Sequence, residues 1–341
     1  MENYTKEIEF AQISGTINSL AVMILNRPAA LNALNLSMIR TLEYHLKQCV
    51  SNDAIQAVVI KAVEGRAFCA GGDIRAAYVA KQEKQANVTH FFKEEYGLNR
   101  LVYHFPKPYI ALLDGITMGG GAGISIHGSY RIGSERLLFA MPETGIGFFP
   151  DIGASYFLPR LPHYFGFYLG LTGVRIGLAD CLALGLVDFY IPHAEQEVFL
   201  QTLPDVEIAT AIKMFAKPAE KSLLWHERDS VEKCFSKNTV EEIIAALLAQ
   251  KNNWCQETAA LLQTRSPTSL KVTLRALQKG RELDFDACMQ MEYNIAMRFL
   301  AGEEFFEGIR AAVIDKDQKP HWQPAVLADV SDKAVSEYFG G

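Results

Sequence analysis

The stretch YIALLDGITMGGGAGISIHGSYRIGSERLLFAMPETGIGFFPD, residues 109–151, decides the fold. It opens with an apolar run from Tyr109 that predicts a buried strand ending at Asp114. Four glycines follow within residues 119–123, where a helix would start. Glycine inside a helix costs roughly 1 kcal/mol relative to alanine, so the cluster indicates either a close approach to the backbone or tight packing of a helix on a strand. The segment alone leaves both interpretations open.

Two carboxylates later in this stretch have apolar neighbours. Glu143 follows Pro142, and Asp151 follows Pro150 after two phenylalanines. A carboxylate held against apolar walls has a raised pKa and can act as a general acid, a general base or a nucleophile. Each Pro-Glu or Pro-Asp pair taken alone is also typical of a turn or a helix N-cap.

The residues before this stretch alternate between strand and helix patterns. Residues 20–25 and 57–60 are short apolar runs, and residues 36–50 between them carry apolar side chains at helical spacing. Strand, helix and strand at this spacing predict a βαβ unit with parallel pairing and a right-handed crossover.

A second glycine-bearing loop follows at Cys69-Ala70-Gly71-Gly72-Asp73-Ile74. Asp73 is placed to cap a helix that begins near Ile74. The first turn of a helix has N–H groups without internal partners, so such a loop suits an anion or a developing oxyanion. A capped helix start without any ligand explains the same residues.

Residues 88–104 predict a helix with Phe91 on its apolar face. At 100° per residue, Glu95 lies about 40° from Phe91 and therefore on the buried stripe. Glu95 is either a buried carboxylate or a boundary residue that extends to water. Glu94 lies nearer the edge of the stripe, and we expect it to reach solvent or an arginine such as Arg100.

Glycines become rare from about residue 200, and helical periodicity dominates residues 240–248, 270–277 and 287–299. The sequence therefore predicts an α/β protein with a core at residues 1–200 that carries the site and a helical C-terminal region at residues 201–341.

The composition limits the classes of function that fit this chain. The 341 residues include 33 basic and 39 acidic side chains, a net charge of −6 with no polybasic run, which argues against nucleic acid and membrane partners. No apolar run is long enough to span a bilayer. The six cysteines show no metal-ligand spacing or disulfide pattern, and the N-terminus shows no leader, so we expect a cytoplasmic protein.

Five motifs taken together resemble the crotonase (enoyl-CoA hydratase/isomerase) superfamily, in that family's order. They are NRPAALNAL at residues 26–34, FCAGGDI at 68–74, GITMGGGAG at 115–123, FAMPETGIG at 139–147, and LTG at 171–173 with GLVD at 185–188. Four segments are more similar to the 3-hydroxyisobutyryl-CoA hydrolases of this superfamily and extend the resemblance to nearly the whole chain. They are FFKEEY at 91–96, MPET at 141–144 with FPD at 149–151, SPTSL at 266–270 and EGIRAAVIDKD at 307–317.

The resemblance implies a crotonase-like spiral of ββα units followed by a helical C-terminal region. It implies that the backbone N–H groups of Gly72 and Gly120 form an oxyanion hole for the thioester oxygen. Coenzyme A would run past Ala70, Asp73 and Ile74. The residues expected to contact the substrate are Glu95, Gly120, Glu143 and Asp151.

The implied activity is hydrolysis of a short 3-hydroxyacyl-CoA, with 3-hydroxyisobutyryl-CoA of valine catabolism as the expected substrate. Glu143 would attack the carbonyl or activate a water, Asp151 would orient or protonate the reacting groups, and Glu95 would bind the substrate hydroxyl or assist the reaction. A hydratase of this family carries a glutamate where Gly123 stands, so its catalytic pair is incomplete here. An enoyl-CoA hydratase or isomerase, and a catalytically silent acyl-CoA-binding relative, remain alternatives.

Coenzyme A is part of this substrate, so we expect no separate cofactor and no metal. The superfamily forms trimers and larger assemblies, which leaves a homo-oligomer open. Arg27 and Lys316 are candidates for contacts with the coenzyme A phosphates, and both are equally explained as surface charges.

Overall fold

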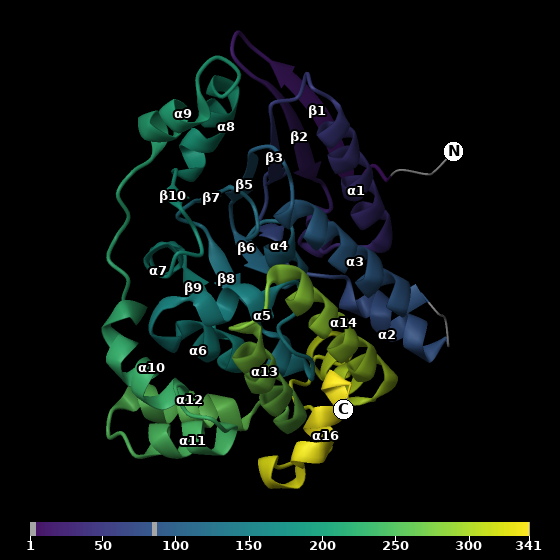
Figure 1. The fold of residues 1–341 in the computed structure, drawn as a ribbon, viewed down its shortest axis with the longest axis vertical. Helices are drawn as coiled ribbons and strands as arrows, with labels where there is room; N and C mark the ends of the chain where they lie inside the picture. The colour runs from purple at the N-terminus through teal and green to yellow at the C-terminus, as the bar shows by residue number, and fades with distance from the viewer. Residues whose placement is uncertain (1–4, 84–86, 341) are drawn as a thin grey trace. The chain divides into compact units, whose positions relative to one another are not determined.

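The structure is a computed structural model that describes residues 5–83 and 87–340. The chain divides into two compact units, each assembled from several stretches of sequence (Figure 1). Unit 1 comprises Met1–Asp73, Glu94–Phe139 and Arg175–Leu223, and unit 2 comprises Ile74–Lys93, Ala140–Val174 and Leu224–Gly341. The predicted division between residues 1–200 and 201–341 stays a prediction.

Unit 1 contains a six-stranded sheet with the order β1-β2-β3-β5-β7-β10. Strands β1 and β2 pair antiparallel, and the other neighbours pair in parallel. The strands are β1 (Ile8–Ser14), β2 (Ser19–Leu25), β3 (Ala57–Ala62), β5 (Tyr109–Leu113), β7 (Tyr130–Gly133) and β10 (Phe189–Tyr190). The predicted parallel βαβ unit is confirmed, because α1 (Leu36–Ser51) connects β2 to β3.

A second, smaller sheet has the order β4-β6-β8-β9. Its strands are β4 (Ala67–Cys69), β6 (Ile116–Met118), β8 (Leu138–Ala140) and β9 (Ile176–Gly177). Strands β4 and β6 are parallel, so their carboxyl ends lie at the same edge of the sheet. The two glycine loops of the sequence follow these two strand ends directly.

The core of unit 1 lies between the six-stranded sheet and the helices α8 (His193–Thr202) and α9 (Ile208–Phe215) (Figure 1). Val59 of β3 and Phe199 of α8 belong to this apolar cluster, and both are fully buried. Burying a side chain of this kind stabilises a fold by roughly 1.5–3 kcal/mol, so this cluster stabilises the packing of α8 and α9 on the six-stranded sheet.

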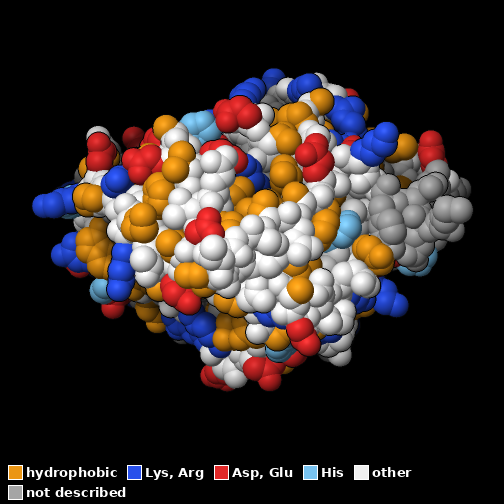
Figure 2. Space-filling model, turned by 90° about the horizontal axis from the view of Figure 1, so that it is seen from above, with side chains coloured by type: hydrophobic (Ala, Val, Ile, Leu, Met, Phe, Trp, Pro, Cys, Tyr) orange, Lys and Arg blue, Asp and Glu red, His pale blue; other side chains and the backbone are white. Residues whose placement is uncertain are grey.

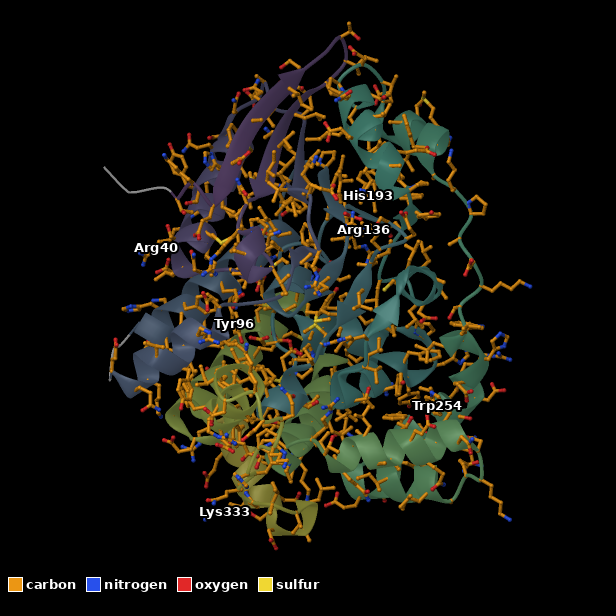
Figure 3. The ribbon with its side chains drawn as sticks, turned by 180° about the vertical axis from the view of Figure 1, so that it is seen from behind. Arg40, Tyr96, Arg136, His193, Trp254 and Lys333 are labelled. Atoms are coloured by element: carbon orange, nitrogen blue, oxygen red, sulfur yellow. The ribbon has the colours of Figure 1, made fainter. Side chains whose placement is uncertain are left out.

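Charged residues connect the end of β5 to the start of α8. The Asp114 carboxylate lies 3.0 Å from Nδ1 of His193, and Arg136 Nη1 lies 3.0 Å from Nε2 of the same ring. Arg136 and His193 are labelled side by side in Figure 3. Asp114 also accepts a hydrogen bond from Ser134 Oγ, so this cluster joins two loops of unit 1 to the start of α8.

Unit 2 is helical. Its helices are α2 (Ile74–Gln82), α5 (Ala154–Phe157), α6 (Phe165–Thr172), α10 (Arg228–Phe235), α11 (Val240–Leu248), α12 (Asn253–Gln263), α13 (Pro267–Gly280), α14 (Phe285–Ala301), α15 (Glu304–Ile309) and α16 (Asp332–Ser336), and it also contains the first residues of α3 (Asn87–Tyr103). Thr239 and Glu242 form a capping box at the start of α11, which is why this helix begins where the sequence predicts.

Acidic and basic side chains are interspersed on the face drawn in Figure 2. Among the residues that the structure describes, no helix has the length and apolar character needed to cross a membrane.

Candidate functional site

The first glycine loop follows β4 in unit 1 and is held by backbone hydrogen bonds. The N–H of Leu34 donates to the carbonyl of Gly71 at 2.8 Å, and the N–H of Asp73 donates to the carbonyl of Leu34 at 2.8 Å. Gly71 has a φ of 116°, a conformation that side chains rarely adopt. These constraints fix the backbone of Gly72 between the two bonded residues.

The second glycine loop follows β6 and comes close to the first. Gly119 has a φ of 46°, and α4 (Gly120–Gly123) begins directly after it. A Cβ atom built on Gly120 would lie 3.3 Å from the nitrogen of Gly72. The two predicted oxyanion-hole residues are therefore neighbours within unit 1.

The two interpretations of the glycine cluster apply to different residues. A Cβ atom on Gly121 would overlap the carbonyl oxygen of Cys69, so Gly121 is required for packing against β4. A Cβ atom on Gly120 would instead overlap the Glu95 carboxylate. Of these two glycines, Gly120 is the one whose Cβ position lies against an acidic side chain.

Glu95 on α3 is buried, with 3% of its surface exposed, so the interpretation as a boundary residue is wrong. Burial raises the pKa of the Cys69 thiol to about 12, and the nearby Glu95 charge acts in the same direction. Glu94 was expected to meet solvent or an arginine such as Arg100. The structure shows an arginine partner, Arg40 on α1, whose Nε and Nη2 donate to the Glu94 carboxylate at 2.6 and 2.7 Å (Arg40 is labelled in Figure 3).

The residues predicted to bind coenzyme A are partly exposed. Helix α2 begins at Ile74, as predicted, and Ala70, Asp73 and Ile74 are each half-buried. The Asp73 carboxylate lies 2.8 Å from the Arg27 guanidinium, which also lies 3.1 Å from Glu7. Arg27 therefore forms ion pairs with two carboxylates of unit 1, and this weakens the case for Arg27 as a phosphate ligand.

Glu143 opens a short 3-10 turn in unit 2, Glu143–Ile146, with Pro142 at its N-cap. The turn is anchored by Phe148, whose N–H donates to the Glu143 carbonyl at 3.0 Å. Gly147 closes it with a φ of 69°. The backbone thus forms the turn typical of a Pro-Glu pair, while the Glu143 side chain is buried with 6% exposed.

Asp151 is also buried in unit 2, with 6% of its surface exposed. It directly follows an aromatic cluster in which Phe148 and Phe305 lie 4.5 Å apart and Phe149 stacks on Phe299 at 5.7 Å. Both carboxylates therefore have the low exposure that the sequence predicts. The roles given to them stay predictions.

One buried carboxylate was missed by the sequence reading. Glu292 on α14 has no exposed surface. It lies on the apolar stripe of this helix between Met289 and Ile295, which are also buried. The same helical-wheel argument that placed Glu95 inside would have found it.

Metal ligation finds no support in the residues that the structure describes, because they contain no group of three His, Cys, Asp or Glu side chains that could hold an ion. All six cysteines are described, and all are free and buried.

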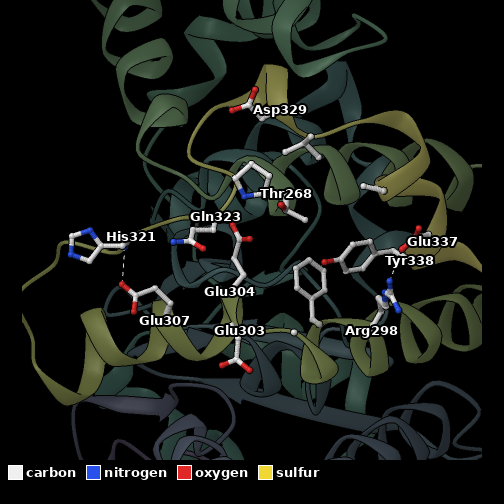
Figure 4. A pocket seen from close by; sticks show the side chains of 15 residues that line it. Thr268, Arg298, Glu303, Glu304, Glu307, His321, Gln323, Asp329, Glu337 and Tyr338 are labelled. Atoms are coloured by element: carbon white, nitrogen blue, oxygen red, sulfur yellow. Dashed lines mark hydrogen bonds and ion pairs between the residues drawn. The ribbon is translucent and has the colours of Figure 1, made fainter.

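A separate pocket of about 570 Å³ lies among the C-terminal helices of unit 2 (Figure 4). Several acidic side chains that line it are bound to neighbours: Glu307 to Arg310 at 2.9 Å and Glu337 to Arg298 at 2.5 Å. Burial raises the pKa of a third, Glu304. None of the residues predicted for the acyl-CoA site lines this pocket.

The two glycine loops and the buried carboxylates occur on a fold that comparison identifies. The chain belongs to the enoyl-CoA hydratase/isomerase family, whose sequence profile matches residues 20–339. Among individual relatives, the chain is 43% identical to a mitochondrial 3-hydroxyisobutyryl-CoA hydrolase of Mus musculus, over 93% of this chain and 86% of the relative. It is 40% identical to a probable 3-hydroxyisobutyryl-CoA hydrolase of Arabidopsis thaliana, over 94% of this chain and 89% of the relative.

The structure also matches a crystal structure described as a carnitinyl-CoA dehydratase from Mycobacterium thermoresistibile. The TM-score is 0.93 and the identity 34%, over 98% of this chain and 96% of the other. The predicted family and crotonase-like α/β fold are confirmed. The mouse relative is named as mitochondrial, and the expected cytoplasmic location of this chain stays a prediction.

Proposed function

We propose that the protein hydrolyses the thioester of a short 3-hydroxyacyl-CoA, with 3-hydroxyisobutyryl-CoA as its substrate. The products are 3-hydroxyisobutyrate and coenzyme A. The observation that carries the proposal is the buried Glu143 carboxylate at the start of its turn, in a chain that has Gly123 where a hydratase of this family has its second glutamate. The similarity to hydrolases over more than nine-tenths of the chain supports it.

In this proposal the N–H groups of Gly72 and Gly120 bind the thioester oxygen. Negative charge develops on that oxygen when the carbonyl carbon becomes tetrahedral. A preorganised donor is worth roughly 2.7–4 kcal/mol of transition-state stabilisation. The neighbouring position of the two glycine loops supports this role.

Glu143 then acts on the thioester carbon, either by attacking it or by removing a proton from an attacking water. The two routes need the same carboxylate facing the same atom. In the water route, the new C–O bond forms as the proton passes to Glu143, and the C–S bond breaks when the tetrahedral intermediate collapses. Asp151 orients or protonates the reacting groups, and coenzyme A leaves as the thiol.

Glu95 binds the 3-hydroxyl of the acyl group in this account. Its carboxylate is buried beside Gly120, which binds the thioester oxygen in the same proposal. A buried acceptor favours a substrate that can donate a hydrogen bond to it, because an analogue without the hydroxyl leaves the acceptor unsatisfied.

A second candidate function is hydration or dehydration of an enoyl-CoA. The relative with a TM-score of 0.93 carries the name of a dehydratase, which is the observation in favour of this candidate. The incomplete glutamate pair at Gly123 speaks against it. A silent acyl-CoA-binding relative would keep the glycine loops without a need for Glu143 and Asp151.

Turnover in water labelled with ¹⁸O separates these candidates. A hydrolase acting on 3-hydroxyisobutyryl-CoA places the label in the carboxylate of the released acid. A hydratase acting on crotonyl-CoA places it in a 3-hydroxyl group and leaves the thioester intact. A silent relative incorporates no label from either substrate.

A further inference from the structure

The Glu292 carboxylate binds the loop that follows Asp151, and all of these residues belong to unit 2. One of its oxygens accepts the N–H of Gly153 at 2.7 Å. The other accepts the N–H of Ser155 at 2.8 Å and the Ser155 hydroxyl at 2.6 Å. A carboxylate without exposed surface thus receives three hydrogen bonds from one short segment.

The segment that Glu292 binds has an unusual backbone. Ile152 has a φ of 57° and Gly153 has a φ of 88°. A left-handed conformation is a clear outlier for a β-branched residue such as isoleucine. Such a conformation persists only where the surrounding structure enforces it, and these conformations cluster at functional sites.

The contacts of the segment explain how it is enforced. The N–H of Ala154 donates to the Asp151 carbonyl at 2.9 Å, and the N–H groups on either side of it, from Gly153 and Ser155, donate to Glu292. The carbonyl of Ser155 lies against Gly280 of α13, where a Cβ atom would overlap it. The turn is therefore held from α14 by Glu292 and from α13 by close packing.

We propose that Glu292 is a positioning residue for Asp151: by holding the N–H groups of Gly153 and Ser155 it keeps the strained turn closed and fixes the direction of the Asp151 carboxylate. This inference rests on the proposed function, which gives Asp151 its role in thioester cleavage. Glu292 itself has no contact with the substrate in this account.

The pKa of Glu292 is set by opposing effects. Burial raises the pKa of Glu292 to about 8, against the effect of its three hydrogen-bond donors, and the charge of Asp151 raises it further. The Glu292 charge also acts on Cys288 of the same helix, whose thiol pKa burial raises to about 11. The protonation state of Glu292 therefore depends on the charge of Asp151.

The test compares Glu292→Gln with the wild type by two independent readouts. Glutamine has nearly the same shape, but its NH2 group is a hydrogen-bond donor and would face the N–H or O–H donors of the loop. At least one of the three hydrogen bonds to the loop is therefore lost. The first readout is hydrogen exchange of the peptide that contains residues 151–157, which needs no activity. The second is the steady-state hydrolysis of 3-hydroxyisobutyryl-CoA. Gln290→Ala, on the exposed side of α14, is the matched control.

We expect Glu292→Gln to speed exchange at Gly153 and Ser155 and to lower kcat at least about tenfold, with KM within about threefold of the wild type. Because Glu292 acts through Asp151, Glu292→Gln should lower kcat by less than about twofold when it is introduced into the Asp151→Asn variant. Ser155→Ala removes only one of the three bonds, so it should give a smaller loss of the same kind, and it keeps the test decisive if Glu292→Gln does not fold.

Unchanged exchange in Glu292→Gln would overturn the holding role, and faster exchange with unchanged kcat would overturn the positioning role. Full additivity with Asp151→Asn would also overturn positioning through Asp151. Failure of the proposed function gives a different result: the wild type releases no thiol from any 3-hydroxyacyl-CoA, while the exchange comparison still decides whether Glu292 holds the turn.

Discussion

The carboxylate of Glu95 lies against the α-carbon of Gly120, so closely that a Cβ atom on this glycine would overlap it. Helix α3 supplies the carboxylate, and the loop after β6 supplies the glycine. In the proposed function these two groups bind the hydroxyl and the thioester oxygen of one acyl group. The contact therefore sets the distance between the two polar ends of the acyl chain.

This contact makes Gly120 a sensitive position. We expect Gly120→Ala to lower kcat/KM for 3-hydroxyisobutyryl-CoA at least about tenfold, because the new methyl group displaces either Glu95 or the backbone donor. The control is Gly97→Ala on α3, where a Cβ atom would meet nothing within 4 Å. Thiol release and thermal unfolding are measured for both variants. Equal activity of the two would show that the Glu95–Gly120 contact has no part in catalysis.

Glu95 should determine the preference for hydroxylated substrates. The wild type should favour 3-hydroxyisobutyryl-CoA over isobutyryl-CoA, and in Glu95→Ala this preference should shrink, mainly through slower reaction of the hydroxylated substrate. An unsatisfied buried partner costs roughly 1–3 kcal/mol, or about five- to 150-fold in the ratio. Glu94→Gln, one residue earlier and bound to Arg40, is the control. If Glu95→Ala lowers the activity toward both substrates by the same factor, Glu95 instead belongs to the chemistry that both substrates share.

Glu143 should carry most of the chemical step. Glutamine is nearly isosteric with glutamate but acts neither as base nor as nucleophile, so Glu143→Gln should lower kcat at least about 100-fold while the protein stays folded. Asp151→Asn should lower kcat as well. Thiol release under saturating substrate measures both, with circular dichroism as the check of folding. Wild-type turnover in both variants would leave the two carboxylates with only their turn-forming roles.

The sequence predicted the local elements well because apolar runs and helical periodicity are local signals. The parallel strands β2, β3 and β5 were each visible as short apolar runs, and the bounds of α11 match the prediction. The assembly of each unit from three separate stretches was not visible, because it depends on contacts between residues far apart in the chain.

The same distinction applies to the candidate site. Helix geometry placed Glu95 on the buried stripe but left open whether its carboxylate is buried or extends to water. The arginine that binds Glu94 is Arg40, which is 54 residues away on another helix and offered no local signal. The neighbouring position of Gly72 and Gly120 came from the family resemblance. Glu292 was missed because its segment was read only for periodicity, and its three bonds join residues more than 130 positions apart.

Glu292 should also make stability depend on pH. Its pKa is raised from 4.5 to about 8 in the folded protein, so folding favours the protonated form. Its contribution to stability is therefore fully present below about pH 4.5 and is lost as the pH rises through about 8. Between about pH 5 and pH 8.5, the melting temperature of the wild type should fall relative to that of Glu292→Gln. Calorimetry measures the melting temperature of both proteins across this pH range. A constant difference between their melting temperatures would contradict a raised pKa at Glu292.

The most direct test of the account compares two reactions of the purified wild type: release of thiol from 3-hydroxyisobutyryl-CoA and loss of the enoyl chromophore of crotonyl-CoA. The six cysteines of the chain are buried, so they contribute little to the thiol signal while the protein is folded. We predict that kcat/KM for hydrolysis exceeds that for hydration at least about tenfold, which is about 1.4 kcal/mol between the two transition states. Hydration faster than hydrolysis would contradict the proposed function.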